Sequence, residues 1–174
     1  MNILITGGAG YIGSHITKWL VKQKTNKVFV LDNLSTGNKK LINKKAFFIK
    51  GDIKNFNFLK KIIKGFEIHT IIHLAAFLNI SESERKKKTY FKNNILGTKN
   101  LILACKNSQV RNFIFSSSCS IYGDQKSFVN EQTKIKPKSY YAYTKHMSEK
   151  IIKKFSKKYN ISYGIFRYFN VAGA

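Results

Sequence analysis

The fold is decided by the segment Thr6-Gly7-Gly8-Ala9-Gly10-Tyr11-Ile12-Gly13, in which glycines fall between an apolar run and a helical pattern. Residues 2–6 form the apolar run, and residues 11–22 carry apolar side chains at helical spacing (Ile12, Ile16, Trp19 and Leu20). Glycines let the chain turn sharply and let a phosphate approach the backbone. The helix that follows directs free N–H groups at such an anion. The segment therefore predicts a dinucleotide-binding turn in which Gly7, Gly10 and Gly13 surround a pyrophosphate.

The rest of the chain alternates between strand and helix patterns. We predict further strands at residues 27–31, 46–49, 70–74, 112–116 and 162–168, and helices at 55–64, 87–107 and 139–159. In the long helix, one face should carry Phe91, Ile95, Thr98, Ile102 and Cys105. This alternation implies right-handed βαβ units. We therefore expect one α/β domain over residues 1–174, a Rossmann-type, doubly wound parallel sheet between two helical layers.

Acidic residues follow the second and third predicted strands. Asp32 stands 19 residues beyond Gly13, a spacing that suits a carboxylate bound to the adenosine ribose hydroxyls. Such a carboxylate repels a 2′-phosphate, so NAD is favoured over NADP. The alternative is a tight turn with a capping aspartate. Asp52 could accept a hydrogen bond from the adenine amino group or serve only as a turn residue. For His15 and His73 we favour structural roles over ligand roles.

Tyr141 and Lys145 are four residues apart, so on a helix they share one face. A neighbouring ammonium lowers a tyrosine pKa, as does the positive charge of an oxidised nicotinamide, and the phenolate can then act as a base. Without context, an ordinary amphipathic helix face explains the spacing equally well. The predicted strand that ends in Ser116-Ser117-Ser118 supplies that context, because a serine there could bind the same substrate oxygen.

Composition restricts the remaining function classes. The 43% hydrophobic content is that of a globular protein, and the N-terminus lacks a signal-peptide pattern, so we expect a cytoplasmic protein. Neither the cysteines nor the histidines have metal-ligand spacing. The net charge of +24 comes from 32 basic residues, of which 29 are lysines spread along the chain. A polyanion partner would explain it, but we favour compositional drift, since a nucleic-acid reader would use more arginine.

These motifs, in this order, resemble those of the UDP-glucose 4-epimerases, members of the extended short-chain dehydrogenase/reductases. The resemblance rests on segments that span nearly the whole chain: Thr6–His15, Leu31–Leu34, Gly51–Ile53, Asn93-Asn94 with Gly97-Thr98, Asn112–Ser118 with Tyr122–Asp124, Tyr141-x-x-x-Lys145 and Arg167–Asn170.

The resemblance implies a role for each matching residue. Ser118, Tyr141 and Lys145 would be catalytic, and Asn170 would begin the UDP-sugar site together with Ser118 and Tyr141. NAD would be bound by Gly7, Gly10, Tyr11, Ile12, Gly13, Asp32, Asn33, Asp52, Ile53, Leu74, Ala75, Ala76, Asn93, Tyr141, Lys145 and Phe169. As partners we expect a UDP-sugar, no specific nucleic acid and no membrane, and we allow for a homodimer.

The implied reaction is epimerisation at C4 of the sugar. Tyr141 would take the C4 hydroxyl proton while the C4 hydride passes to NAD, and the hydride would return to the other face of a 4-keto sugar. The related 4,6-dehydratases carry an Asp-Glu pair after the catalytic hydroxyl residue, whereas this chain has Cys119 and Ser120. Another nucleotide-sugar epimerase or dehydratase, or a non-catalytic NAD-binding module, remains the alternative.

Two departures from the family pattern carry expectations of their own. Leu78 stands where some epimerases carry a lysine near the cofactor, which would weaken binding without disabling the chemistry. Family members also continue into a smaller domain that holds the UDP-sugar, and most of it is absent from these 174 residues. We therefore expect this chain alone to be inactive or nearly so.

Overall fold

The sheet in this computed structural model, which describes residues 1–173, has six parallel strands. They are β1 (Asn2–Thr6), β2 (Lys27–Asp32), β3 (Phe47–Lys50), β4 (Thr70–His73), β5 (Asn112–Ser118) and β6 (Ser162–Tyr168). Their order is β3-β2-β1-β4-β5-β6, and every neighbouring pair is parallel. The order reverses direction between β1 and β4, which is where ligands bind in doubly wound sheets. The predicted Rossmann-type fold is confirmed.

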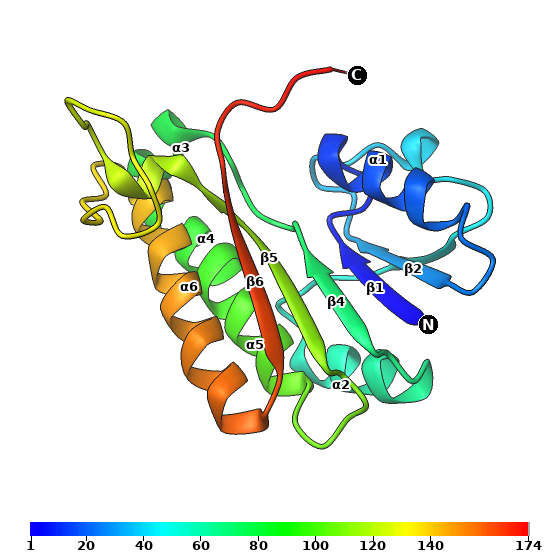
Figure 1. Ribbon diagram of the computed structural model, residues 1–174. Helices are drawn as coiled ribbons and strands as arrows, with labels where there is room; N and C mark the ends of the chain where they lie inside the picture. The colour runs from blue at the N-terminus through cyan, green and yellow to red at the C-terminus, as the bar shows by residue number, and fades with distance from the viewer. Residues whose placement is uncertain (174) are drawn as a thin grey trace.

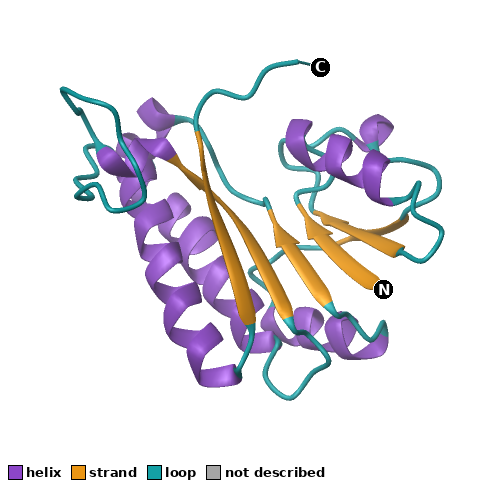
Figure 2. Cartoon of the chain, in the orientation of Figure 1, coloured by secondary structure: helices purple, strands orange, loops and turns teal. Residues whose placement is uncertain are grey.

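Helices cover both faces of the sheet (Figures 1 and 2). One face carries α1 (Tyr11–Leu20), and the other carries α2 (Phe56–Gly65), α5 (Gly97–Ala104) and α6 (Tyr140–Tyr159). The shorter helical segments are α3 (Ile80–Arg85), α4 (Lys87–Tyr90), the π-helical segment η2 (Phe91–Leu96) and the 3₁₀ turns η1 (Lys39–Leu41) and η3 (Cys119–Tyr122). None of the helices within residues 1–173 is both long and apolar enough to span a bilayer.

Strand alternation divides the core into two layers. Leu4 packs with the α2, α5 and α6 side, whereas its neighbours Ile3 and Ile5 pack with Leu20 on the α1 side. The first layer is the larger one, and it buries Leu59, Ile63, Leu101, Phe113 and Ile152 among others. Because successive strand side chains point to opposite faces, a strand buried on both faces reads as a continuous apolar run.

The predicted helix over residues 87–107 is not one regular α-helix, because it is divided into α4, the π-helical segment η2 and α5. Residues 91–96 form a π-helical segment, so the face that the 3.6-residue period predicts is rotated there. Ile95, Thr98, Ile102 and Cys105 are buried as expected, but Phe91 is 39% exposed. Trp19, one of the apolar residues at helical spacing in α1, is 62% exposed. The sequence analysis also missed α3 entirely.

Candidate cofactor and catalytic site

The glycine turn after β1 has no room for side chains at two positions. Gly7 has a φ of +75°, and a Cβ there would lie 2.7 Å from the backbone nitrogen of Ala75. A Cβ on Gly13 would lie 2.3 Å from the carbonyl oxygen of Gly7. Both distances are below any real contact, so Gly7 lets the backbone after β4 approach the turn, and Gly13 lets α1 pack on it.

The N-terminus of α1 differs from those of α2, α3 and α6. Asn55 caps α2, Asn79 caps α3 and Ser139 caps α6, each through a side-chain oxygen that accepts a backbone N–H. Helix α1 begins after Gly10 without a side-chain cap and without an acidic residue in its first turn. Its first N–H groups and the positive end of its dipole are therefore available to an anion.

A pocket lies at this end of α1, above the carboxyl ends of the central strands. Twelve of the predicted NAD-binding residues line it: Gly7, Gly10, Tyr11, Ile12, Gly13, Asp32, Asn33, Ile53, Leu74, Ala75, Ala76 and Asn93. The lining also contains residues that the sequence analysis did not assign to the cofactor: Leu31, Ser35, Thr36, Gly37, Gly51, Phe77, Leu78 and Ser116. Four predicted cofactor residues lie outside this lining, namely Asp52, Tyr141, Lys145 and Phe169.

Asp32 is buried at the end of β2, and its carboxylate is already used within the chain. One oxygen accepts the N–H of Ala9 at 3.0 Å, and the other accepts the N–H of Leu34 at 2.8 Å. Leu34 adopts a left-handed φ of 60°, so Asp32 does stabilise a turn as the alternative interpretation holds. Each carboxylate oxygen has a second acceptor site, so this role leaves capacity for a ligand hydroxyl.

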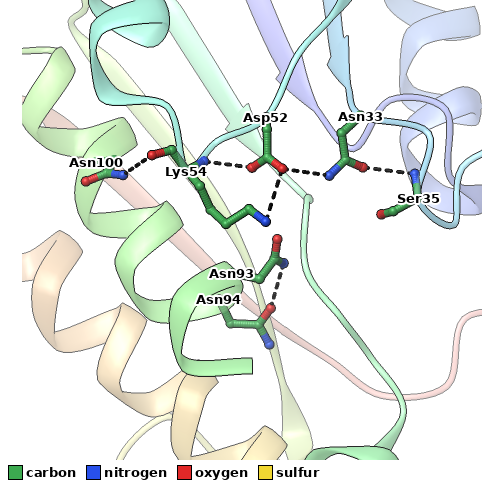
Figure 3. Close-up of polar contacts among 7 residues, drawn as sticks. All are labelled: Asn33, Ser35, Asp52, Lys54, Asn93, Asn94 and Asn100. Atoms are coloured by element: carbon green, nitrogen blue, oxygen red, sulfur yellow. Dashed lines mark hydrogen bonds and ion pairs between the residues drawn. The ribbon is translucent and has the colours of Figure 1, made fainter. Parts of the chain in front are cut away.

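Asp52 also has a structural role that the sequence left open (Figure 3). Its carboxylate accepts the backbone N–H of Lys54 at 2.8 Å and the side-chain amide of Asn33 at 3.1 Å. Burial works against the charged form, but these hydrogen bonds and the Lys54 ammonium, 3.3 Å away, hold the pKa of Asp52 below its usual value. Asp52 thus fixes the turn after β3 and orients Asn33 at the pocket.

Two buried asparagines stand where the π-helical segment faces the pocket (Figure 3). Asn93 lines the pocket and donates to the side-chain oxygen of Asn94 at 3.0 Å. Asn94 accepts the N–H of Phe77 at 2.9 Å, and its amide donates to the Phe77 carbonyl and to the Thr144 hydroxyl, each at 3.1 Å. Asn94 therefore links the pocket wall at Phe77 to helix α6.

The predicted catalytic residues come together at the carboxyl end of β5. Tyr141 and Lys145 lie on α6, and Ser118 ends β5, close enough to Tyr141 to lower the pKa of its phenol. Lys145 is 2% exposed, and its Nζ donates to the Ser116 carbonyl at 2.7 Å. Since Ser116 also lines the cofactor pocket, this group stands directly beside it.

The expected pKa of Tyr141 needs correction. The spacing predicts a lowered value, but burial raises the pKa of Tyr141, and the hydrogen bond from Ser118 offsets only part of this effect. The reason is the direction of Lys145, whose ammonium is bound to Ser116 and lies 5.0 Å from the Phe115 ring centre but 5.9 Å from that of Tyr141. Burial also lowers the pKa of Lys145 to about 8.

His73 and His15 are both predicted to have structural roles, and their surroundings differ. His73 is fully buried, and its ring nitrogens bond the hydroxyls of Thr6 at 2.7 Å and Thr98 at 2.8 Å, which confirms a structural role. Burial lowers the pKa of His73 to about 3, so it is neutral at physiological pH. His15 is exposed on α1 and contacts the edge of the Tyr11 ring, so its structural role stays a prediction.

Phe169 and Asn170 follow β6 and are both exposed. Phe169 borders a surface hollow with Cys119, Tyr122 and Val129, away from the glycine turn. The structure does not bring these two residues to the cofactor pocket, and their predicted contacts with NAD and UDP-sugar stay predictions.

Comparison with known proteins agrees with this geometry. The family described as "NAD dependent epimerase/dehydratase family" matches residues 3–174. A UDP-glucose 4-epimerase of Lactobacillus helveticus is 42% identical over 175 residues, an alignment that covers 100% of this chain and 53% of the relative.

Solved structures give the same result. A Thermotoga maritima UDP-glucose 4-epimerase with UDP-glucose superposes with a TM-score of 0.94 at 35% identity, covering 99% of this chain and 57% of that one. A Brucella ovis UDP-glucose 4-epimerase in complex with NAD gives a TM-score of 0.94 at 35% identity, with coverages of 99% and 53%. The chain thus spans about half the length of the relatives it matches, and it belongs to the NAD-dependent epimerase/dehydratase family.

Proposed function

We propose that this chain binds NAD and supplies the catalytic residues for 4-epimerisation of a nucleotide sugar, UDP-glucose and UDP-galactose being the expected pair. One observation carries the proposal. The uncapped start of α1, the Asp32 carboxylate and the Ser118, Tyr141 and Lys145 group all stand at the carboxyl edge of one sheet, around one pocket and its border.

The chain's own residues fit an NAD molecule. The free N–H groups at the start of α1 would hold the pyrophosphate, and the second lone pairs of Asp32 would accept the adenosine ribose hydroxyls. Ile53 would pack on the adenine ring, and Asp52 is adjacent for its amino group. A 2′-phosphate beside the Asp32 carboxylate would be repelled, so NAD is the expected form of the cofactor.

Bound NAD would supply a reversible hydride acceptor next to the sugar C4 atom. Tyr141 would then take the C4 hydroxyl proton, with Ser118 hydrogen-bonded to the same oxygen. Burial keeps Tyr141 protonated in its own surroundings, and its pKa would fall beside the positive charge of an oxidised nicotinamide ring. Lys145 would bind the nicotinamide ribose through an N–H group that the Ser116 carbonyl does not use.

Epimerisation is favoured over dehydration because no acid stands beside the catalytic hydroxyls. The two residues after Ser118 are Cys119 and Ser120, and the Ser120 hydroxyl donates to Ser118 at 2.9 Å. The one carboxylate buried under this part of α6, Glu149, is paired with Arg167. Elimination of water needs an additional acid and base, and neither a thiol nor a hydroxyl replaces them.

The test is a calorimetric titration of the purified chain with NAD, with NADP as the control ligand. Saturable binding of NAD, at least about tenfold tighter than that of NADP, is expected, because one mispaired charge contributes roughly 1.4 kcal/mol or more. Equal affinity for the two cofactors would contradict the role of Asp32. Absence of binding by a folded chain would contradict the proposal as a whole.

A matched pair of variants locates the binding site. Gly13→Ala places a methyl group against the Gly7 carbonyl, whereas Gly65→Ala meets nothing within 4 Å. Only Gly13→Ala should weaken NAD binding, by about tenfold or more, through displacement of α1 from the turn.

Turnover of UDP-galactose by the 174-residue chain is expected to be absent or nearly so, and ready turnover would show that the remainder of the family's length is not required.

A further inference from the structure

A buried ion pair lies one helical turn beyond Lys145. The Glu149 carboxylate is 1% exposed and accepts two hydrogen bonds from the Arg167 guanidinium, at 3.1 Å from Nε and 2.9 Å from Nη2. It also accepts the Ser117 hydroxyl at 2.5 Å. Glu149 is thus fully engaged between α6, β5 and β6. An ion pair this deep costs desolvation energy, and replacing such a pair with apolar groups is often neutral or stabilising.

The pair is attached to both partners of the catalytic group. Ser117 stands between Ser116, whose carbonyl accepts the Lys145 ammonium, and Ser118, whose side chain neighbours Tyr141. Arg167 is the register partner of Ser117 in β6, and its Nη1 donates to the Tyr122 hydroxyl at 2.8 Å in the turn that follows Ser118. One carboxylate therefore anchors α6 to the strand segment that carries both contacts.

The charges around Lys145 come from three elements. His73 of β4 is neutral, Tyr141 of α6 is protonated, and Arg167 of β6 adds a second, partly buried cation. His146 and Lys153 of α6 also face Glu149. Glu149 is the acid on the same helix face, about 5 to 6 Å away between Cβ atoms, and its charge opposes the effect of burial on Lys145.

We propose that Glu149 is a positioning residue for the catalytic group: held by Arg167 and Ser117, it fixes α6 on β5 and places a negative charge one helical turn from Lys145. This inference rests on the proposed roles of Tyr141 and Lys145. The Glu149–Arg167 pair would then position the catalytic residues in addition to stabilising the fold.

The test follows Lys145 directly, without any cofactor. The chain is labelled with carbon-13 at the lysine ε positions, and the signal that titrates far below the others is assigned by its loss in Lys145→Met. In Glu149→Gln the midpoint of this signal should fall by about one pH unit, since a nearby opposite charge shifts a pKa by roughly that much or more. Glu131→Gln is the matched control, because Arg167 bonds only the backbone carbonyl of Glu131 and the exposed Glu131 side chain makes no hydrogen bond to the pair, and it should leave the midpoint unchanged.

Two further variants keep the test decisive if Glu149→Gln does not fold. Arg167→Met should raise the Lys145 midpoint. The double variant Glu149→Gln/Arg167→Met should return the midpoint toward its value in the unaltered chain. It should also unfold at a higher temperature than Glu149→Gln. If Glu149→Gln or Arg167→Met lowers the unfolding temperature but leaves the Lys145 midpoint in place, the pair is only a structural brace and the inference is wrong. Failure to bind NAD would overturn the proposed function without affecting this titration.

Discussion

Lys145 shows how a single residue opposes stability. Its folded pKa of about 8 lies below the ordinary value of 10.5, so the protonated side chain destabilises the fold. For such a group, stability rises with pH between 8 and 10.5, because the unfolded chain binds more protons there. Below that window the cost is complete, on the order of 3 kcal/mol, with the hydrogen bond to Ser116 and the contact with the Phe115 ring already included.

Lys145→Met should therefore be more stable than the unaltered chain at pH 7, by about 1 to 2 kcal/mol after the loss of these contacts. The advantage should shrink as pH rises from 8 toward 10.5. Urea unfolding at a series of pH values measures both effects. A variant that is less stable at neutral pH would mean that the Ser116 and Phe115 contacts outweigh the cost of burying the charge.

At this scale, the sequence predicts residues whose function depends on local spacing. The glycine turn, Asp32 and the pair Tyr141 and Lys145 could all be found because a turn or a helix fixes their relative positions over a few residues. Contacts between distant segments could not be found. The Tyr141 N–H donates to Ser83 at 3.0 Å across 58 residues, and Glu149 meets Arg167 across 18, neither of which any local pattern encodes.

At the scale of elements, periodicity identified every strand but not the irregular helices. A π-helical turn adds a residue to the helix, so a 3.6-residue pattern runs out of phase through residues 91–96. The six-residue α3 is too short and polar for periodicity, but its start carried a signal that was overlooked. Asn79 stands three residues before Glu82, as in a capping box, and its side chain does accept the Glu82 N–H at 2.8 Å.

The π-helical segment should depend on Asn94 for its position. This buried amide uses both N–H groups and its oxygen to connect Phe77, Asn93 and Thr144. Asn94→Ala would leave several buried polar groups without partners and should cost about 2 to 4 kcal/mol of unfolding free energy. Amide hydrogen exchange should also increase in residues 74–79 and in the first turns of α6.

Asn100→Ala is the matched control for this variant. Asn100 lies on α5 and donates a single, exposed hydrogen bond to the Lys54 carbonyl at 2.9 Å, so its loss should cost under about 1 kcal/mol. Equal costs for the two variants would show that the network around Asn94 adds nothing to an ordinary surface contact.

At the scale of the whole molecule, like charges oppose the compact state. The chain carries 32 basic and only 8 acidic residues, and a net charge of this size destabilises a fold through self-repulsion. The exposed ion pairs of Lys86 with Glu82 and of Lys87 with Glu84 compensate for little of it, since such surface pairs contribute about 1 kcal/mol or less.

The unfolding temperature should therefore rise by several degrees as sodium chloride is increased from about 0.02 to 0.2 M. Over that range the Debye screening length falls to roughly 10 Å or less, which weakens the repulsion between lysines. The control is the same series near pH 10.1, the isoelectric point of the sequence, where the repulsion is largely removed and the gain should be much smaller. A salt effect of equal size at both pH values would point to ion binding or surface-tension effects. No effect at neutral pH would mean that the lysines are too far apart on the surface to repel one another at all.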